Sequence, residues 1–342
     1  MEKLDILNYD RASLEQELSQ NFNLQPFRAR QIISWLYRRK LQSFKEMTDI
    51  SKEVRTLLED NFRITRPKLV TVQKSKDGTR KYLFEVEDGS KIESVLIAQP
   101  KRHTLCISSQ VGCAIGCKFC ATAQMGLKRH LKTSEIIGQA LAVLEDEEAT
   151  DFTNIVFMGM GEPFHNIDNV IKTVKLLNDP LGMEIPARKI TVSTSGLVPA
   201  IKKFGESGAG ANLAVSLNAT TNEVREKIMP INKRWPIEVL LQALKDYPLK
   251  GSRKITIEYV MLKDVNDSEQ DLKRLPKLLH GMPVKVNLIP YNDNTGLGYG
   301  QPSVQKINKW QSRLLDLGMN STIRWSKGND IDAACGQLAT SN

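Results

Sequence analysis

Cysteine is scarce in this sequence, with only five among 342 residues. An odd, low count is unlike the paired cysteines of a small secreted domain, so we expect a reducing, cytoplasmic setting. The sequence also lacks any run of about 18 apolar residues, the length that a membrane-spanning helix needs, and we expect no contact with a membrane. A hydrophobic content of 41% and a charged content of 25% are ordinary for a folded protein and exclude long disorder.

Acidic residues are missing from one long stretch. None occurs between Ser94 and Ser134, although the whole chain has 39 acidic residues against 48 basic ones and a net charge of +9. This basic window contains Lys101, Arg102, Lys118, Lys128, Arg129 and Lys132, and a second acid-free group, the N-terminal basic group, contains Arg28, Arg30, Arg38, Arg39 and Lys40. Such groups are typical of a polyanion-binding surface, although a solvated face is the alternative interpretation.

The first hundred residues change from one periodicity to another. Apolar residues at three and four spacing predict three helices at 12–18, 27–39 and 51–62, which form a helical module over residues 1–62. A period of two follows in KLVTVQ, KYLFEVE and KIESVLIA, with turn signals at 76–79 and 87–90. We therefore expect a small antiparallel β extension over residues 63–102.

Strands and helices alternate in the remainder, residues 103–342. Six β-branched runs (TLCIS, TNIVFMG, KITVSTS, NLAVSLN, KITIEYVM and VKVNLIP) are each followed by a helical pattern. Six such units predict an α/β fold with a parallel sheet and right-handed crossovers, curved into a partial six-unit (β/α) barrel. In such folds the functional residues lie at the carboxyl ends of the strands.

Three of the five cysteines follow the first of these strands directly. Cys113, Cys117 and Cys120 form a C-x3-C-x2-C run, whose thiols could hold zinc or an iron-sulfur cluster. Structural zinc normally has a fourth Cys or His at short spacing, and none follows here. A 4Fe-4S cluster held by three cysteines would keep one iron open for a ligand, and we favour that interpretation.

A C-x3-C-x2-C loop after the first strand of such a barrel resembles the radical S-adenosylmethionine (SAM) superfamily. The resemblance implies that the three cysteines hold one 4Fe-4S cluster and that its open iron binds the amino and carboxylate groups of SAM. Phe119, just before the last cysteine, also fits the pattern. The reduced cluster of that superfamily cleaves SAM to a 5′-deoxyadenosyl radical, so the difficult chemistry belongs to the cofactor.

Several further motifs, in order between about residues 80 and 340, narrow the resemblance. CISSQVGCAIGCKFCATA, FMGMGEP, STSG, MPIN, VNLIPYN and DIDAACGQL are similar to motifs of the dual-specificity RNA adenine carbon-2 methyltransferases. The resemblance implies methylation of 23S ribosomal RNA, at the peptidyl-transferase centre, and of transfer RNA next to the anticodon. It also implies a flavodoxin or ferredoxin type electron donor and a thiol reductant as partners, and we expect a monomer.

The same resemblance implies roles for three isolated residues. Cys335 would be methylated by one SAM through nucleophilic displacement, and a second SAM would supply the radical that takes a hydrogen atom from the new methyl group. The resulting carbon radical would add to adenine and join protein to RNA. Cys106 would resolve this adduct by forming a disulfide with Cys335, and Glu93 would accept the proton from carbon 2. Taken alone, Cys106 and Glu93 read as ordinary strand residues.

The cofactor contacts implied by the resemblance are at Gly161, Glu162, Ser193, Ser216, Leu217, Asn218 and Asn292. Asn218 stands where many members have His, and only a backbone contact is expected there. Relatives that methylate carbon 8 tend to read GEA, STIG and LIRYN, whereas this chain has GEP, STSG and LIPYN, which favours carbon 2. The alternatives are a carbon-8 methyltransferase, a radical SAM enzyme with a non-RNA substrate, and a non-catalytic iron-sulfur or RNA-binding protein.

Overall fold

The computed structural model describes residues 2–100, 102–293 and 296–340, so Lys101 of the basic window lies outside the described residues. The three predicted N-terminal helices are confirmed as α1 (Arg11–Phe22), α2 (Pro26–Tyr37) and α3 (Lys52–Asn61). The Asp10 carboxylate accepts a hydrogen bond of 2.9 Å from the Ser13 N–H and caps α1. Among the described residues, no helix combines the length and the apolar character that crossing a membrane requires.

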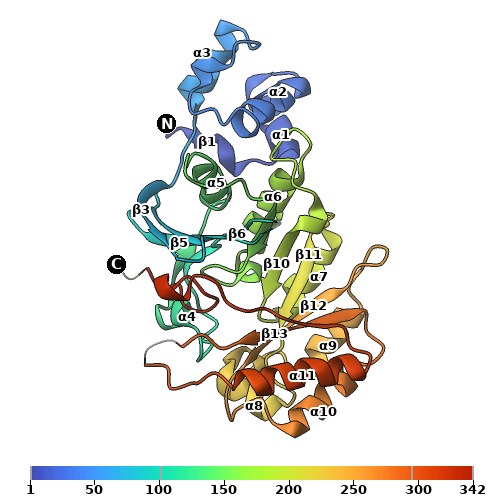
Figure 1. The fold of residues 1–342 in the computed structure, drawn as a ribbon. Helices are drawn as coiled ribbons and strands as arrows, with labels where there is room; N and C mark the ends of the chain where they lie inside the picture. The colour runs from blue at the N-terminus through green and yellow to red at the C-terminus, as the bar shows by residue number, and fades with distance from the viewer. Residues whose placement is uncertain (1, 101, 294–295, 341–342) are drawn as a thin grey trace.

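One ten-stranded sheet forms the centre of the molecule (Figure 1). Its strand order is β14-β13-β12-β11-β10-β9-β6-β5-β4-β3. The strands are β3 (Lys68–Lys74), β4 (Arg80–Glu85), β5 (Lys91–Ile97), β6 (Thr104–Cys106), β9 (Asn154–Phe157), β10 (Ile190–Thr194), β11 (Asn212–Ser216), β12 (Ile255–Met261), β13 (Val284–Pro290) and β14 (Ser321–Ile323).

The six predicted barrel strands are confirmed, and they pair in parallel from β6 to β13. The structure adds a seventh parallel strand, β14, which the sequence did not indicate because it is only three residues long. β3, β4 and β5 are antiparallel, as predicted, but β5 also pairs with β6 and joins the extension to the barrel sheet. The division into parts 1–62, 63–102 and 103–342 stays a prediction.

The barrel strands bury one apolar residue after another. Leu105, Ile155, Val192, Val215 and Ile257 are all fully enclosed, and each buried aliphatic side chain contributes about 1.5–3 kcal/mol to folding. The helices that cover the sheet are α5 (Thr133–Leu144), α6 (Ile167–Asn178), α7 (Val198–Glu206), α8 (Asn222–Ile228), α9 (Ile237–Lys245), α10 (Glu269–Leu278) and α11 (Val304–Asp316).

The N-terminal helices lie at one end of the molecule, above α5 and α6 (Figure 1). Asn8 accepts a hydrogen bond of 3.0 Å from the Ser134 N–H at the start of α5, and Arg11 forms an ion pair of 3.1 Å with Asp179 after α6. These contacts fix the module against the barrel. Short elements complete the chain: β1 (Leu4–Asp5) pairs with β2 (Phe62–Arg63), and 3-10 turns occupy Ile6–Asn8, Phe44–Glu46, Pro163–Asn166, Ala187–Lys189, Pro230–Lys233 and Asn329–Ile331.

A two-stranded ribbon that the sequence did not predict carries the cysteine run. β7 (Gln110–Gly112) pairs with β8 (Leu127–His130), and the loop between them, 113–126, contains the three cysteines and the short helix α4 (Ala121–Gln124). Gly112 has a φ of +74°, and a Cβ there would lie 1.8 Å from the Gly126 carbonyl oxygen. The ribbon therefore closes only with glycine at this position.

Candidate functional site

A single cavity gathers most of the predicted site residues at the carboxyl ends of the parallel strands. Its empty volume is about 1040 Å³, including the part open to solvent. Ten of the thirteen predicted residues line it: Cys113, Cys117, Cys120, Gly161, Glu162, Ser193, Ser216, Asn218, Asn292 and Cys335. The other three, Glu93, Cys106 and Leu217, lie outside the lining.

The three cysteines of the run are free thiols that face this cavity. Burial raises the pKa of Cys113 to about 12 and also raises the pKa of Cys117 and Cys120, so the apo site favours neutral thiols. Within the described residues, no three Cys, His, Asp or Glu side chains converge closely enough to hold one metal ion. A 4Fe-4S cluster is larger than a single ion, and three thiols that line one cavity are the donor set that it takes.

Glu162 lies at the bottom of the cavity, after β9. One carboxylate oxygen accepts a hydrogen bond of 2.7 Å from the Ser195 N–H, and the other accepts one of 2.9 Å from the Phe164 N–H. Burial raises its pKa. The side chains of Ser195 and Thr194 also favour its charged form. A carboxylate in this position could bind the ammonium group of a ligand.

The glycine before Glu162 is required by close packing. Gly161 has a φ of +98°, and a Cβ there would lie 2.5 Å from the Cβ of Gln110. The Gln110 side-chain oxygen accepts a hydrogen bond of 2.7 Å from the Glu162 N–H. The strand β7 therefore fixes the backbone that presents Glu162.

Asn218 directs its side chain to the protein. Its oxygen accepts a hydrogen bond of 2.8 Å from the Val260 N–H, and its backbone carbonyl accepts one of 2.7 Å from the Asn266 amide. It has a φ of +56°, in the left-handed region that Asn tolerates better than most residues. Both the side-chain oxygen and the backbone carbonyl thus have partners within the protein, and the cofactor contact at Asn218 stays a prediction.

The C-terminal segment that carries Cys335 is held on both sides. Asn292 donates a hydrogen bond of 3.1 Å to the Cys335 carbonyl, and the Gly336 carbonyl accepts one of 2.8 Å from the Ala121 N–H in the cysteine loop. Ala333 and Ala334 are buried, and Cys335 is half-buried. The small side chains of this segment allow it to pack closely.

Glu93 belongs to the inner face of β5 and is 2% exposed. One carboxylate oxygen forms an ion pair of 3.3 Å with Lys81, and the other accepts hydrogen bonds of 3.0 and 3.1 Å from the N–H groups of Ala339 and Thr340. Glu93 therefore binds the C-terminal segment just beyond Cys335, although it does not line the cavity.

Two ionisable residues near the cysteines, the half-buried Arg324 and the buried Glu258, were not predicted. Arg324, after β14, contacts the Met158 sulfur at 2.9 Å, and its positive charge lowers the pKa of both Cys106 and Cys335 against the larger effect of burial. Burial still leaves the pKa of Cys106 raised to about 12. Glu258 lines the cavity, and burial raises its pKa. In the sequence an arginine after a short strand carries no signal of burial.

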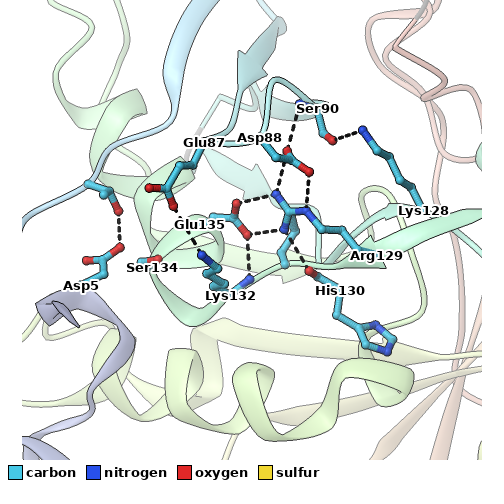
Figure 2. Close-up of polar contacts among 12 residues, drawn as sticks. Asp5, Glu87, Asp88, Ser90, Lys128, Arg129, His130, Lys132, Ser134 and Glu135 are labelled. Atoms are coloured by element: carbon cyan, nitrogen blue, oxygen red, sulfur yellow. Dashed lines mark hydrogen bonds and ion pairs between the residues drawn. The ribbon is translucent and has the colours of Figure 1, made fainter. Parts of the chain in front are cut away.

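Acidic side chains from other parts of the chain pair with residues of the basic window, which corrects the sequence-based expectation. Arg129 on β8 donates hydrogen bonds of 2.7–3.0 Å to Asp88 in the β4–β5 turn and to Glu135 on α5 (Figure 2). Lys128 donates to Ser90 at 2.7 Å, and Lys132 forms an ion pair with Glu87 (Figure 2). These side chains connect the base of the cysteine loop to neighbouring elements.

The N-terminal basic group is mostly exposed. Arg30, Arg38, Arg39 and Lys40 are exposed, and Arg28 is half-buried. The Arg39 guanidinium lies 3.9 Å from the centre of the Trp35 ring, and Arg28 lies 4.7 Å from that of Phe27. Guanidinium groups on aromatic faces can stack on bases as well as pair with phosphates. Arg38 also forms an ion pair with Glu184.

Two family models match the chain. The radical SAM superfamily matches residues 107–275, which include the cysteine run and the strand ends of the cavity. The ribosomal RNA large subunit methyltransferase N-terminal domain matches residues 4–64, which are the helical module.

Similar proteins extend over nearly the whole chain. The dual-specificity RNA methyltransferase RlmN of Geotalea uraniireducens is 50% identical over 338 residues, covering 99% of this chain and 97% of its own. The RlmN of Syntrophotalea carbinolica is 47% identical, covering 98% and 90%. The crystal structure of a radical SAM methyltransferase from Sphaerobacter thermophilus superimposes with a TM-score of 0.90 at 41% identity, covering 99% of this chain and 100% of that one.

Proposed function

The chain belongs to the RlmN family of radical SAM RNA methyltransferases, and we propose that it methylates carbon 2 of adenine in 23S ribosomal RNA and in transfer RNA. One observation carries this proposal. The three-cysteine run and the distant Cys335 line the same cavity, although more than 200 residues separate them. A radical SAM enzyme without a protein-bound methyl carrier has no need of that juxtaposition.

Cofactor binding is assigned to residues of the cavity. Cys113, Cys117 and Cys120 would hold the 4Fe-4S cluster, which with SAM supplies a 5′-deoxyadenosyl radical when bound. Glu162 would accept the ammonium group of SAM, with Gly161, Ser193, Ser216, Leu217, Asn218 and Asn292 as its other contacts. The fixed carboxylate of Glu162 and the exposure of most of these residues to the cavity support the assignment.

Cys335 would carry the methyl group. Methylation needs its thiolate, and Arg324 supplies the positive charge that favours the thiolate against burial. Two SAM molecules would be used in each turnover, one for methylation of Cys335 and one for radical formation. The hydrogen bonds accepted by the Cys335 and Gly336 carbonyls support a fixed position for its sulfur.

Cys106 and Glu93 would complete the reaction. Glu93 would take the proton from carbon 2, and the adduct would lose one electron, for which the oxidised cluster would be the acceptor. The Cys106 thiolate would then attack the Cys335 sulfur and break its bond to carbon, so that the released methylene carbon takes up a proton to become the methyl group and a disulfide remains. Cys335 raises the pKa of Cys106, and both cysteines raise the pKa of Arg324, which supports their proximity. A thiol reductant must then restore both thiols, and a cytoplasmic location suits that need.

The test uses protein purified anaerobically with its cluster. We expect mass spectrometry to find a methyl group on Cys335, Cys335→Ala to abolish product, and Cys106→Ala to remain covalently attached to RNA. A cluster-containing protein with no methyl group on Cys335 would contradict the proposal. Free, fully methylated RNA from Cys106→Ala would remove the resolving role.

The position of the methyl group is tested separately. RNA from a strain that lacks the enzyme is treated with the purified protein and digested to nucleosides. We expect 2-methyladenosine in both ribosomal and transfer RNA. 8-Methyladenosine would instead assign the carbon-8 reaction, and methylation of one RNA alone would narrow the substrate range.

A further inference from the structure

Arg225 is a fully buried cation in the middle of α8. Its guanidinium donates hydrogen bonds to neutral oxygens only: 2.7 Å to the Ser195 carbonyl, 3.0 Å to the Leu217 carbonyl and 3.1 Å to the Asn232 side chain. Over the part of the chain that the structure describes, it forms no ion pair with a carboxylate. Its charge is therefore uncompensated by any acidic side chain in contact with it.

Such an arrangement is costly unless a negative group is nearby. A buried charge without a partner normally loses several kcal/mol of solvation, and buried arginines are usually paired. Burial lowers the pKa of Arg225 to about 10, so it stays protonated at neutral pH, and the group that acts against this lowering is Cys117. The side chain that acts on Arg225 is thus a cysteine of the run, which would carry negative charge as a thiolate ligand of the cluster.

Arg225 also joins the two halves of the cofactor site. Its carbonyl partners Ser195, Ser216 and Leu217 lie at the ends of β10 and β11, where the cofactor contacts are. The carboxyl end of its own helix accepts a hydrogen bond of 2.9 Å from the Lys118 N–H, inside the cysteine loop. One side chain therefore holds the strand ends while its helix supports the loop.

We propose that Arg225 is a positioning residue that fixes the ends of β10 and β11 and provides the buried counter-charge of the iron-sulfur cluster. This inference rests on the proposed function only in taking the three cysteines as cluster ligands. Reduction of the cluster by one electron adds one negative charge to the site. A fixed cation beside it stabilises the reduced form and raises the reduction potential, which makes electron uptake from a donor easier.

The experiment compares Arg225→Gln and Arg225→Lys with Lys227→Gln. Lys227 is an exposed residue of the same helix whose ion pair with Glu223 lies at the surface, so it controls for general effects of charge. Each protein is reconstituted anaerobically, its iron content is measured, and the cluster is titrated with dithionite while the reduced signal is followed by electron paramagnetic resonance. SAM binding is measured from the change that SAM causes in that spectrum.

We expect Arg225→Gln to have a more negative reduction potential than the wild type and Lys227→Gln. Arg225→Lys keeps the charge but loses the planar fork, so its potential should stay near that of the wild type while SAM binds about tenfold more weakly. Equal potentials in the Gln and wild-type proteins, or equal shifts in the Gln and Lys variants, would overturn the counter-charge role. Unchanged SAM binding in both would overturn the positioning role.

If Arg225→Gln does not fold or load iron, the Lys variant decides the question. A retained potential with weakened SAM binding supports the proposal, whereas a shifted potential or unchanged SAM binding contradicts it. Failure of the wild-type protein to form a cluster would instead contradict the proposed function itself, so the two failures are distinguishable.

Discussion

Substitution of Glu93 by Gln should destabilise the protein as well as impair the reaction, because Glu93 is one half of a buried ion pair. Lys81 and Glu93 are 9% and 2% exposed, and their charged atoms are 3.3 Å apart. Removing one partner of such a pair leaves the other charge buried alone and typically costs about 3–5 kcal/mol. Gln keeps an oxygen that can accept from the Ala339 and Thr340 N–H groups, so most of the loss should come from Lys81.

The measurement is urea unfolding of the metal-free protein for Glu93→Gln, Lys81→Met and the double variant. We expect each single variant to lose about 3–5 kcal/mol and the double variant to regain much of it, because no charge is left buried. RNA methylation by the double variant then separates the two roles of Glu93. Restored stability without product supports Glu93 as the base, whereas restored product would refute that role. The buried pair would be refuted if the stability of Glu93→Gln lay within about 0.5 kcal/mol of the wild type, which is the scatter of neutral substitutions.

Three further outcomes are expected. Burial raises the pKa of Cys106 from 9.0 to about 12, so the contribution of this thiol to stability is complete below pH 9 and is lost as the pH rises through 12. The unfolding free energy of the metal-free wild type should therefore fall more steeply between pH 9 and 11 than that of Cys106→Ala. Alanine at Arg30 and Arg39 should flatten the salt dependence of RNA binding by about one phosphate each. Arg129→Gln should leave it unchanged, because Asp88 and Glu135 already pair with that side chain. Equal salt slopes for the Arg129 variant and the two alanine variants would refute the distinction. Gly328→Ala should lower the melting temperature, since its φ is +69° and a Cβ would lie 2.8 Å from that of Ala333; an unchanged value would show that the segment before Cys335 can shift at no cost.

The sequence was informative where local pattern decides the structure. β-branched runs bounded by turns predicted six of the parallel strands, and the cysteine spacing indicated a loop that the structure places at the cavity. β7 and β8 were missed because they are short and pair across the cysteine loop, so no local alternation marks them. Arg225 reads as an ordinary polar position of a helix, and only the packing of α8 against β10 and β11 places it in the core. The acids that pair with the basic window come from outside it.

The position of Cys335 follows from contacts of the residues just after it. The cysteine loop binds the segment through the Gly336 and Leu338 carbonyls, which accept from the Ala121 N–H and, at 2.5 Å, from the Thr122 hydroxyl. Glu93 binds the next two residues, Ala339 and Thr340, through their N–H groups. The same segment is therefore fixed by the loop that would hold the cluster and by the residue that would act as the base. A change in the cysteine loop or in Glu93 would move the Cys335 sulfur relative to the other of the two. The proposed methyl carrier, cluster and base therefore depend on one another for their positions.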